Sequence, residues 1–457
     1  MATPAERFRT GNYELGTRLV GVYRALDRIR VAKGEVGHID FDLAPVRYVT
    51  LPDGVIKTEE QAEGLLAHYA LQADPRTPDG AFMRASVKAT LAFLRVARGE
   101  PVGYAEYIRE TLETHPNQPF RRRIEDKYNL VADLARECGF TYDPDGWSRY
   151  LQDAAVRPDT VKLEFRKARQ RVIPVLLEEL GLDFNPQYRT EVKPVDEPWM
   201  FWTKVDRRAG VVLTVNTHSR HESQLYQAKF PPLLAHELGA HGFQGLQIRE
   251  GVDKGGLNPF YAISKVPGPE QFGNEGLAIV MCNLLPAVYE ALGPEGRMEA
   301  ERYKLATWAY QVVANEAAQA GEVKPEHWQF IQHFVPSEQQ DRFERQMRER
   351  LEDPVYRSYH PAYSLGSLLL DIAAEVLPIP ARKELVQALL ETYLTPTQIR
   401  RKIEELKSKY IPHGDQEQVV HEISELDEGQ PGFDLRNWLA GLLRGKFSVF
   451  SRSSIAH

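Results

Sequence analysis

The sequence predicts a mainly α-helical protein with one small β-sheet. Apolar residues recur at helical spacing through most of the chain, whereas alternating and β-branched runs are concentrated between residues 185 and 217. The chain has 457 residues, of which 42% are hydrophobic and 26% are charged. That composition is ordinary for a globular protein, and the length is sufficient to bury a sizeable core.

Helical periodicity dominates the first 180 residues. A helix at 13–32 is followed by a stretch at 38–57 that is punctuated by Pro and Gly and contains β-branched residues, which predicts irregular chain or a short strand. The next helices are expected at 58–73, 79–98, 101–114, 120–138 and 158–180. Turn formers gather between 138 and 160, which predicts a boundary between a helical N-terminal region at 1–157 and a second region at 158–457. One continuous domain is the alternative.

The pattern changes in the segments PQYRTEVKPV, EPWMFWTKVD and AGVVLTVNT, which predict the strands of a small sheet at about 185–217. We expect VVLTVNT to be an edge strand along which an extended peptide could lie. Helical periodicity then returns at 223–248, 270–293, 298–320, 361–377, 381–393 and 396–410.

Charge and composition exclude several classes of function. Lys and Arg number 57 against 64 Asp and Glu, so the net charge of −7 gives no electrostatic case for a nucleic-acid or anionic-membrane partner. The N-terminus lacks an apolar signal segment and no run of about 18 apolar residues occurs, so we expect a cytoplasmic protein without a membrane partner. The two cysteines, Cys138 and Cys282, lack CxxC spacing and are expected to be reduced thiols.

The segment HELGAH at 236–241 is the strongest candidate for a metal site. Two imidazoles, His236 and His241, flank a carboxylate, Glu237, which is the set that a zinc-dependent peptidase uses to hold its metal and to activate water. In the usual HExxH motif the histidines are four residues apart and share one face of an α-helix. In this chain they are five apart, and five regular α-helical steps would separate them by about 140° around the helix and about 7.5 Å along it.

A π-type turn removes this difficulty, because its wider hydrogen bonding returns residues five apart to nearly the same face. Gly239 lies inside the turn and Gly242 just after it, and glycine makes such a distortion less costly. The spacing therefore predicts a widened turn at Gly239. Without that turn His236 and His241 would be ordinary helix residues.

A third ligand is expected 34 residues after His241, in the segment FGNEGLAIVMCNLL. Gly273 and Asn274 are expected to open a helix that carries Glu275 in its first turn. A second helix that crosses the first would aim the Glu275 carboxylate at the ion.

HELGAH followed by NEGLA resembles the HExGxH and EGLA pair of the tyrosine carboxypeptidase-like metallopeptidases, a gluzincin family, and is also similar to the cowrin-type metallopeptidases. The residue before the EGLA glutamate is Asn274, whereas the bacterial members carry Gln. The resemblance implies a gluzincin-like fold with an active-site cleft and zinc on His236, His241 and Glu275. It also implies that Glu237 polarises the attacking water and passes its proton to the leaving amine.

Two further kinds of side chain would complete such a site. The developing oxyanion needs a donor besides the metal, and we favour Tyr363, with His360 second, in the segment YRSYHPAYSLG. A carboxypeptidase must also neutralise the substrate's terminal carboxylate, for which arginine is suited. The candidate arginines are Arg249, Arg357 and Arg382.

No phosphate-binding loop, GxGxxG turn or GxSxG elbow occurs, so the commonest nucleotide-binding and serine-hydrolase functions are excluded. We therefore expect a zinc-dependent metallopeptidase, with carboxypeptidase action preferred, that acts on a peptide or protein substrate. Two alternatives remain: a non-catalytic, metal-stabilised helical protein that binds a partner, and a zinc hydrolase of a non-peptide amide or ester.

Overall fold

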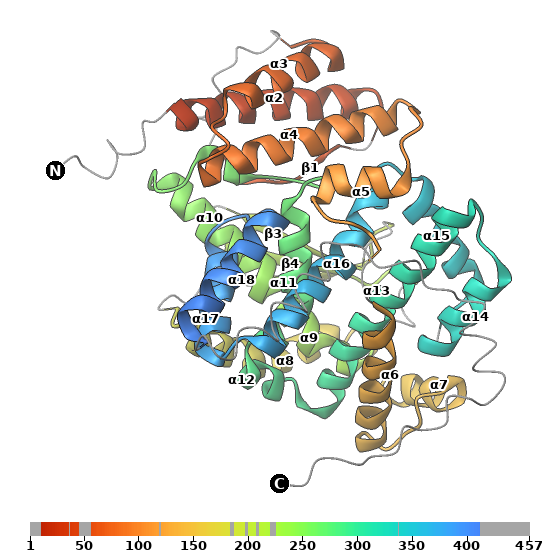
Figure 1. The fold of residues 1–457 in the computed structure, drawn as a ribbon. Coiled ribbons are helices and arrows are strands. Elements are labelled where there is room, and N and C mark those ends of the chain that lie inside the picture. The colour runs from red at the N-terminus through yellow and green to blue at the C-terminus, as the bar shows by residue number, and fades with distance from the viewer. Residues whose placement is uncertain are drawn as a thin grey trace.

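The computed structural model describes residues 11–35, 37–44, 56–117, 120–182, 187–196, 200–206, 210–219, 225–336 and 338–411. Within these ranges the protein is mainly α-helical with a small β part, as the sequence predicts. Figure 1 shows the helices of residues 11–97 stacked at one end of the molecule, with the remaining helices gathered below them. Positions 45–55 of the predicted excursion and residues 412–457 lie outside the described residues.

Helices predominate throughout the described chain, and the strands fall into two short groups. In chain order the elements are α2 (Gly11–Ala32), β1 (Ile39–Asp42), α3 (Glu59–Gln72), α4 (Pro78–Ala97), α5 (Tyr104–Leu112), α6 (Phe120–Glu137), α7 (Pro144–Asp153), α8 (Val161–Leu180), β2 (Tyr188–Lys193), β3 (Phe201–Asp206), β4 (Gly210–Asn216), η3 (Gln227–Lys229), α9 (Phe230–Leu234), η4 (Ala235–Gly242), α10 (Phe243–Asp253), η5 (Pro259–Ala262), β5 (Ile263–Lys265), α11 (Glu270–Leu284), α12 (Pro286–Ala291), α13 (Gly293–Ala320), α14 (Pro325–Phe334), α15 (Gln340–Glu352), α16 (Tyr356–Val376), α17 (Ile379–Glu391) and α18 (Pro396–Tyr410).

Three helices, α7, α14 and α15, form where the apolar pattern predicts none. At α7 the turn formers between 138 and 160 act as a helix start: the side chain of Asp143 accepts a hydrogen bond from the Gly146 amide at 2.7 Å, and Pro144 occupies the first helical position. In α15 the long charged residues conceal a narrow apolar stripe, of which Phe343 and Met347 are buried. The apolar pattern therefore did not reveal α7, which begins with turn residues, or α15, in which charged residues predominate.

The larger sheet has the strand order β2-β4-β3. Strand β2 runs parallel to β4, with Tyr188 opposite Val211, and β3 runs antiparallel to β4, with Phe201 opposite Val215. The expectation that VVLTVNT is an edge strand is therefore wrong, because β4 is the central strand. Hydrogen bonds on both sides of β4 and nearly complete burial of its side chains explain the continuous apolar run. Strand β3 forms one edge of this sheet and packs against the π-helix η4.

Two hydrophobic clusters hold the described residues together. One joins the N-terminal helices to η5 and β5, with Tyr23 and Phe82 against Phe260. The larger cluster takes residues from both sides of position 157, including Phe120 and Trp308, whose ring centroids are 6.1 Å apart. A boundary between two separate regions near residue 157 stays a prediction.

Helices α11 and α16 cross at a contact between two glycines. A Cβ atom added to Gly276 would lie 2.6 Å from the backbone carbon of Gly366, and one added to Gly366 would lie 2.0 Å from the carbonyl oxygen of Phe272. Any side chain at either position would separate the helices. The glycine pair therefore fixes how closely the two helices that carry Glu275 and Tyr363 approach each other.

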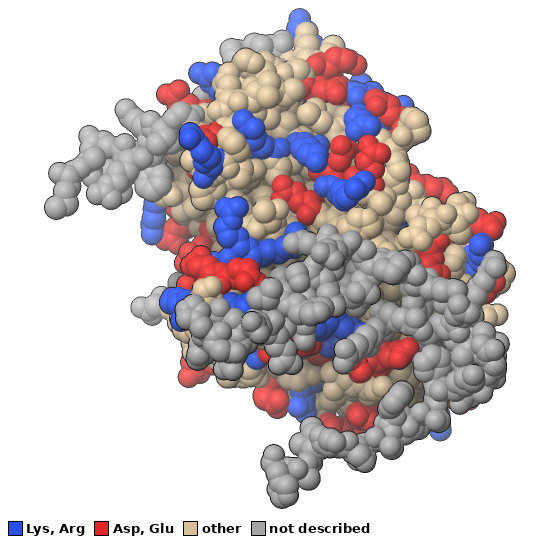
Figure 2. All heavy atoms as spheres, in the orientation of Figure 1, with Lys and Arg blue, Asp and Glu red and all other residues tan. Residues whose placement is uncertain are grey.

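On the face shown in Figure 2, Lys and Arg side chains lie among Asp and Glu side chains over the N-terminal helices rather than gathering by sign. Ion pairs among the N-terminal helices include Arg98 with Glu63 at 2.6 Å and Arg95 with Glu110 at 3.2 Å. Among the described residues, no helix combines the length and the hydropathy needed to cross a bilayer.

Candidate metal centre

The two histidines of HELGAH lie on a π-helix, as their spacing predicts. Helix η4 continues from α9 into α10, and its wider turn brings His236 and His241 to one side, with their Nε2 atoms 3.3 Å apart. Neither Gly239 nor Gly242 adopts a positive φ, so glycine is not needed there for its backbone conformation. What these two positions require is a residue without a side chain. A Cβ atom on Gly239 would lie 2.6 Å from Leu176 Cδ2, so a bulkier residue would have to displace the Leu176 side chain.

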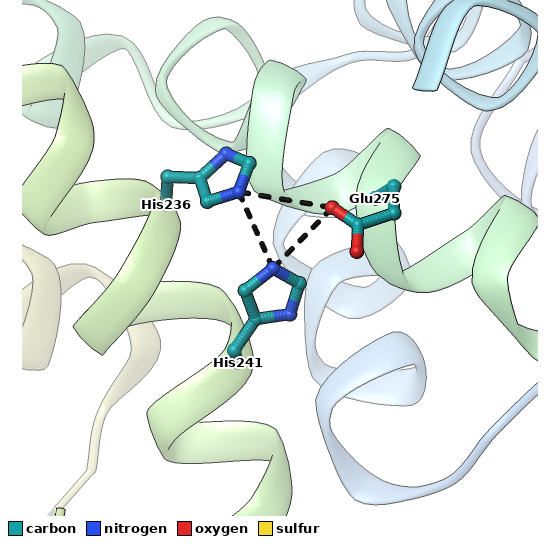
Figure 3. Close-up of side chains that lie close together, drawn as sticks. All are labelled: His236, His241 and Glu275. Carbon is teal, nitrogen blue, oxygen red and sulfur yellow. Dashed lines mark hydrogen bonds and ion pairs between the residues drawn. The ribbon is translucent and has the colours of Figure 1, made fainter. Parts of the chain in front are cut away.

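Glu275 completes a compact triad with the two histidines (Figure 3). Its Oε2 atom lies 3.7 Å from His236 Nε2 and 3.4 Å from His241 Nε2. Helix α11 begins at Glu270, where the predicted helical periodicity also begins, so Gly273 and Asn274 do not open the helix and Glu275 belongs to its second turn rather than its first. The carboxylate is nonetheless directed at both imidazoles from a helix that packs against η4.

The separations within the triad suit a small tetrahedral cation. Bonds of about 2.0–2.1 Å in tetrahedral geometry place neighbouring ligand atoms about 3.3–3.4 Å apart. The observed separations are 3.3, 3.4 and 3.7 Å. In addition, Glu275 Oε2 is buried without a hydrogen-bond partner among the described residues, which is costly for a carboxylate oxygen unless a cation satisfies it. The three side chains therefore fit a zinc ion.

The triad is electrostatically coupled. Burial alone would lower the pKa of His241, but the negative charge of Glu275, aided by Glu237 and Asp40, raises it to about 9. Burial lowers the pKa of His236, which Glu237 and Glu275 only partly oppose. Burial would raise the pKa of Glu275, but His241 and His236 hold it below its usual value. A buried carboxylate thus stays ionised beside two imidazoles, which is the state that a metal ligand requires.

Glu237 lies beside the triad and is oriented by the small sheet. Thr203 Oγ1, on the edge strand β3, donates a hydrogen bond of 2.5 Å to Glu237 Oε2. The other oxygen, Oε1, lies 4.0 Å from His236 Nε2. The sheet therefore holds the carboxylate next to the histidines, and Thr203 is a contributor that the motif does not contain.

Tyr359 and Tyr363 approach the triad from α16. Tyr359 OH donates a 2.8 Å hydrogen bond to Glu275 Oε1, and Tyr363 OH donates one of 3.1 Å to Tyr359 OH. The ring of Tyr363 lies parallel to that of His236, with centroids 6.4 Å apart. Residues four apart share one face of a helix, so both tyrosines point toward Glu275 and His236. The structure thus places Tyr363 near the triad and adds Tyr359.

His360, the second candidate, belongs to another face of α16. Its Nε2 atom lies 3.4 Å from Glu349 Oε2, and its ring stacks on Tyr356 with centroids 5.3 Å apart. Burial lowers the pKa of His360 to about 4 despite that carboxylate. One residue step turns the side chain by about 100° relative to Tyr359, so its ring pairs with α15 instead of the triad.

Asp40 reaches the far side of His241 from the N-terminal part of the chain. The register of β1 against β5 shifts between Ile39 and Phe41, which makes Asp40 the extra residue of a β-bulge. Its Oδ2 atom accepts a hydrogen bond of 3.0 Å from Gln271 Nε2. Asp40 and His241 both line a cavity of about 10 Å³, enough for one water molecule. No local pattern in the sequence indicates this contact.

A cavity of about 540 Å³ leads away from the tyrosines. It is bounded by Tyr359, His360 and Tyr363 at one end and by Lys229 and Arg302 among its other walls. None of the arginines expected to bind a terminal carboxylate lines it. Arg357 donates to the carbonyl of Val102 at 2.7 Å and Arg382 to that of Leu377 at 2.6 Å, while Arg249 lies on α10. Arg357 and Arg382 thus donate hydrogen bonds to backbone carbonyls and do not line the cavity.

Comparison with known proteins identifies a fold but no family. No family model and no curated protein matches this chain. Among solved structures, the chain is similar to one described as "the putative lipoprotein from Colwellia psychrerythraea", with a TM-score of 0.51 and 12% identity. The likeness covers 79% of this chain and 66% of that one, so the chain spans slightly less than two thirds of its neighbour. At this identity the likeness concerns the fold alone.

Proposed function

We propose that this protein is a zinc-dependent metallopeptidase of gluzincin type, with carboxypeptidase action as the preferred subclass. The observation that carries the proposal is the triad of His236, His241 and Glu275 at tetrahedral separations, with the carboxylate of Glu237 held beside it. A structural zinc site would be closed by a fourth protein ligand, whereas these three side chains leave a position for water or substrate. The resemblance of HELGAH and NEGLA to the gluzincin motifs supports the same assignment.

When bound, a zinc ion would supply Lewis acidity, lowering the pKa of a coordinated water and polarising a carbonyl group. Glu237 takes the proton from the attacking water and returns it to the leaving amine. Thr203 keeps the carboxylate in place by binding Oε2, so the proton is carried on Oε1, the oxygen that lies 4.0 Å from His236 Nε2. Tyr363 donates a hydrogen bond to the developing oxyanion, and Tyr359 holds Glu275 in position.

Elemental analysis of the full chain tests the metal site. We expect about one zinc per wild-type chain and a loss of zinc in His241→Ala, because two ligands cannot hold the ion as three do. His68→Ala is the matched control, since His68 lies exposed on α3 and its ring hydrogen-bonds Gln72 on the same helix. Absence of stoichiometric zinc from the wild type, or its loss in the control alone, would refute the site.

The variant Glu237→Gln separates a peptidase from a metal-stabilised binding protein. Glutamine preserves the hydrogen bond with Thr203 but cannot accept the water proton, so we expect zinc content to stay at one while cleavage of a random peptide library falls by at least about 100-fold. Glu250→Gln on α10, an exposed glutamate paired with Lys254, is the control. Unchanged cleavage in Glu237→Gln would contradict its role, and cleavage of small esters without peptides would favour the non-peptide hydrolase.

A further inference from the structure

The cavity beside the tyrosines is lined by one buried arginine, Arg350, that forms no ion pair among the described residues. Arg350, in the last turn of α15, is 3% exposed, and its Nε and Nη1 atoms have no hydrogen-bond partner among the described residues. The acid next to it in sequence, Glu349, faces Arg345 and His360 instead. Two acids line the cavity, Glu338 and Asp341; Glu338 pairs with Arg342 at 3.4 Å, and neither acid forms an ion pair with Arg350 among the described residues. A guanidinium is thus buried in this cavity without a bonded carboxylate.

Such an arrangement is costly without a ligand. Burying a cation costs several kcal/mol unless an anion and hydrogen bonds compensate. The ring of Tyr310, 5.1 Å from Arg350 Cζ, and the C-terminal end of α15 offset part of this cost. Neither supplies a hydrogen-bond acceptor to Nε or Nη1, whereas a carboxylate oxygen would accept from the guanidinium and balance its charge.

The same cavity joins Arg350 to the catalytic centre of the proposed function. Tyr359 and Tyr363 line it together with Arg350, and Tyr359 hydrogen-bonds Glu275. Its volume of about 540 Å³ lies within the range of pockets for small ligands, so it can enclose a residue or two of a peptide. A chain end whose carboxylate lies at Arg350 would be held within the space that opens onto the tyrosine pair.

We infer that Arg350 binds the C-terminal carboxylate of the substrate and thereby restricts cleavage to the end of a peptide chain. This inference rests on the proposed peptidase function and gives it a specificity residue. It replaces the three arginines expected from the sequence. Arg345, on the same helix and lining the same cavity, is a matched contrast because its side chain is 61% exposed and faces Glu349 at 3.9 Å.

The test compares a hexapeptide library with free C-termini and the same library with amidated C-termini, cleaved by the zinc-loaded full chain. We expect the wild type to prefer the free acids by at least about 100-fold, since an amide leaves the buried charge unpaired. Arg350→Gln should lower kcat/KM for the acids by about 100-fold and leave the amides unchanged, while Arg345→Gln stays within about twofold of the wild type. Equal cleavage of acids and amides by the wild type would overturn the inference, as would a preserved preference in Arg350→Gln.

Thermal unfolding distinguishes substrate binding from a structural role. Arg350→Met removes a buried unpaired charge and preserves much of the side-chain volume, so it should melt at the same temperature as the wild type or higher while losing the preference for acids. If Arg350 only stabilises the fold, Arg350→Met and Arg350→Lys would both melt lower and the preference would persist, which overturns the inference.

Direct binding separates failure of this inference from failure of the proposed function. Calorimetric titration with 3-phenylpropionate and with 3-phenylpropionamide should show at least tenfold tighter binding of the acid, and Arg350→Gln should abolish the difference. If the wild type cleaves neither library, the peptidase proposal fails, yet acid binding that depends on Arg350 still supports the carboxylate site. Acid binding that is unchanged in Arg350→Gln overturns it.

Discussion

Replacing Gly366 with alanine should disturb both the fold and the metal centre through a single methyl group. The added Cβ would lie 2.0 Å from the carbonyl oxygen of Phe272 and 3.0 Å from the Cα of Gly276. Ordinary contact begins at 3.4 Å, so α16 must move from α11 by about 1.4 Å. Both obstacles are backbone atoms, which cannot rotate away as a side chain would.

That displacement has two measurable consequences. Overpacking of this kind costs about 1–3 kcal/mol, so the urea midpoint of the full chain should fall. The 2.8 Å hydrogen bond from Tyr359 to Glu275 would stretch beyond bonding distance, so zinc should be lost more readily during dialysis against a chelator.

The matched control is Gly64→Ala on α3. Gly64 lies within a helix with nothing within 4 Å of its added Cβ, so alanine should raise stability by about 0.5–1 kcal/mol and leave zinc affinity unchanged. If Gly366→Ala unfolds at the wild-type urea concentration and retains zinc equally well, the reasoning that the glycine crossing positions Glu275 and Tyr359 is refuted.

Individual contacts give three further predictions. Tyr363→Phe should lower kcat about 100-fold with little change in KM in steady-state kinetics, because it removes an oxyanion donor. Tyr359→Phe should mainly weaken zinc binding, measured by competition with a chelator, because it removes the hydrogen bond to Glu275. The reverse pattern would exchange the roles of the two tyrosines. Burial raises the pKa of Asp40 to about 7, so above this pH Asp40→Asn removes a negative charge beside His241 and should weaken zinc affinity about 10- to 100-fold in the same competition. An unchanged affinity at about pH 8.5 would exclude that contribution. Burial, with Arg30 and Lys265, lowers the pKa of His38 to about 3, so the neutral ring stabilises the fold above pH 6.5 and this contribution is lost as the pH falls toward 3, at about 1.4 kcal/mol per pKa unit. His38→Phe should therefore flatten the pH dependence of the unfolding free energy between pH 6.5 and 3. An equally steep dependence in the variant would contradict this reasoning.

The sequence predicted those helices, strands and site residues that are indicated by a pattern within a short stretch of the chain. Periodicity predicted most helices and the sheet at 185–217, and five-residue spacing predicted the π-turn that η4 forms. The site's chemistry was also local in part, because His236, Glu237 and His241 occupy one short segment. Glu275 was found because a glutamate at a helix start near the motif can face its histidines, although it lies in the second turn of α11 rather than the first.

The distant side chains that meet this segment became evident only from the tertiary structure. Thr203, Asp40, Tyr359 and Arg350 come from four separate elements, and their contacts depend on strand order, a β-bulge and helix packing. Periodicity reveals which face of a helix is buried but not which neighbour covers it. The central position of β4 illustrates this limit, because an apolar strand fits a sheet centre or a covered edge equally well until its hydrogen-bond partners are known.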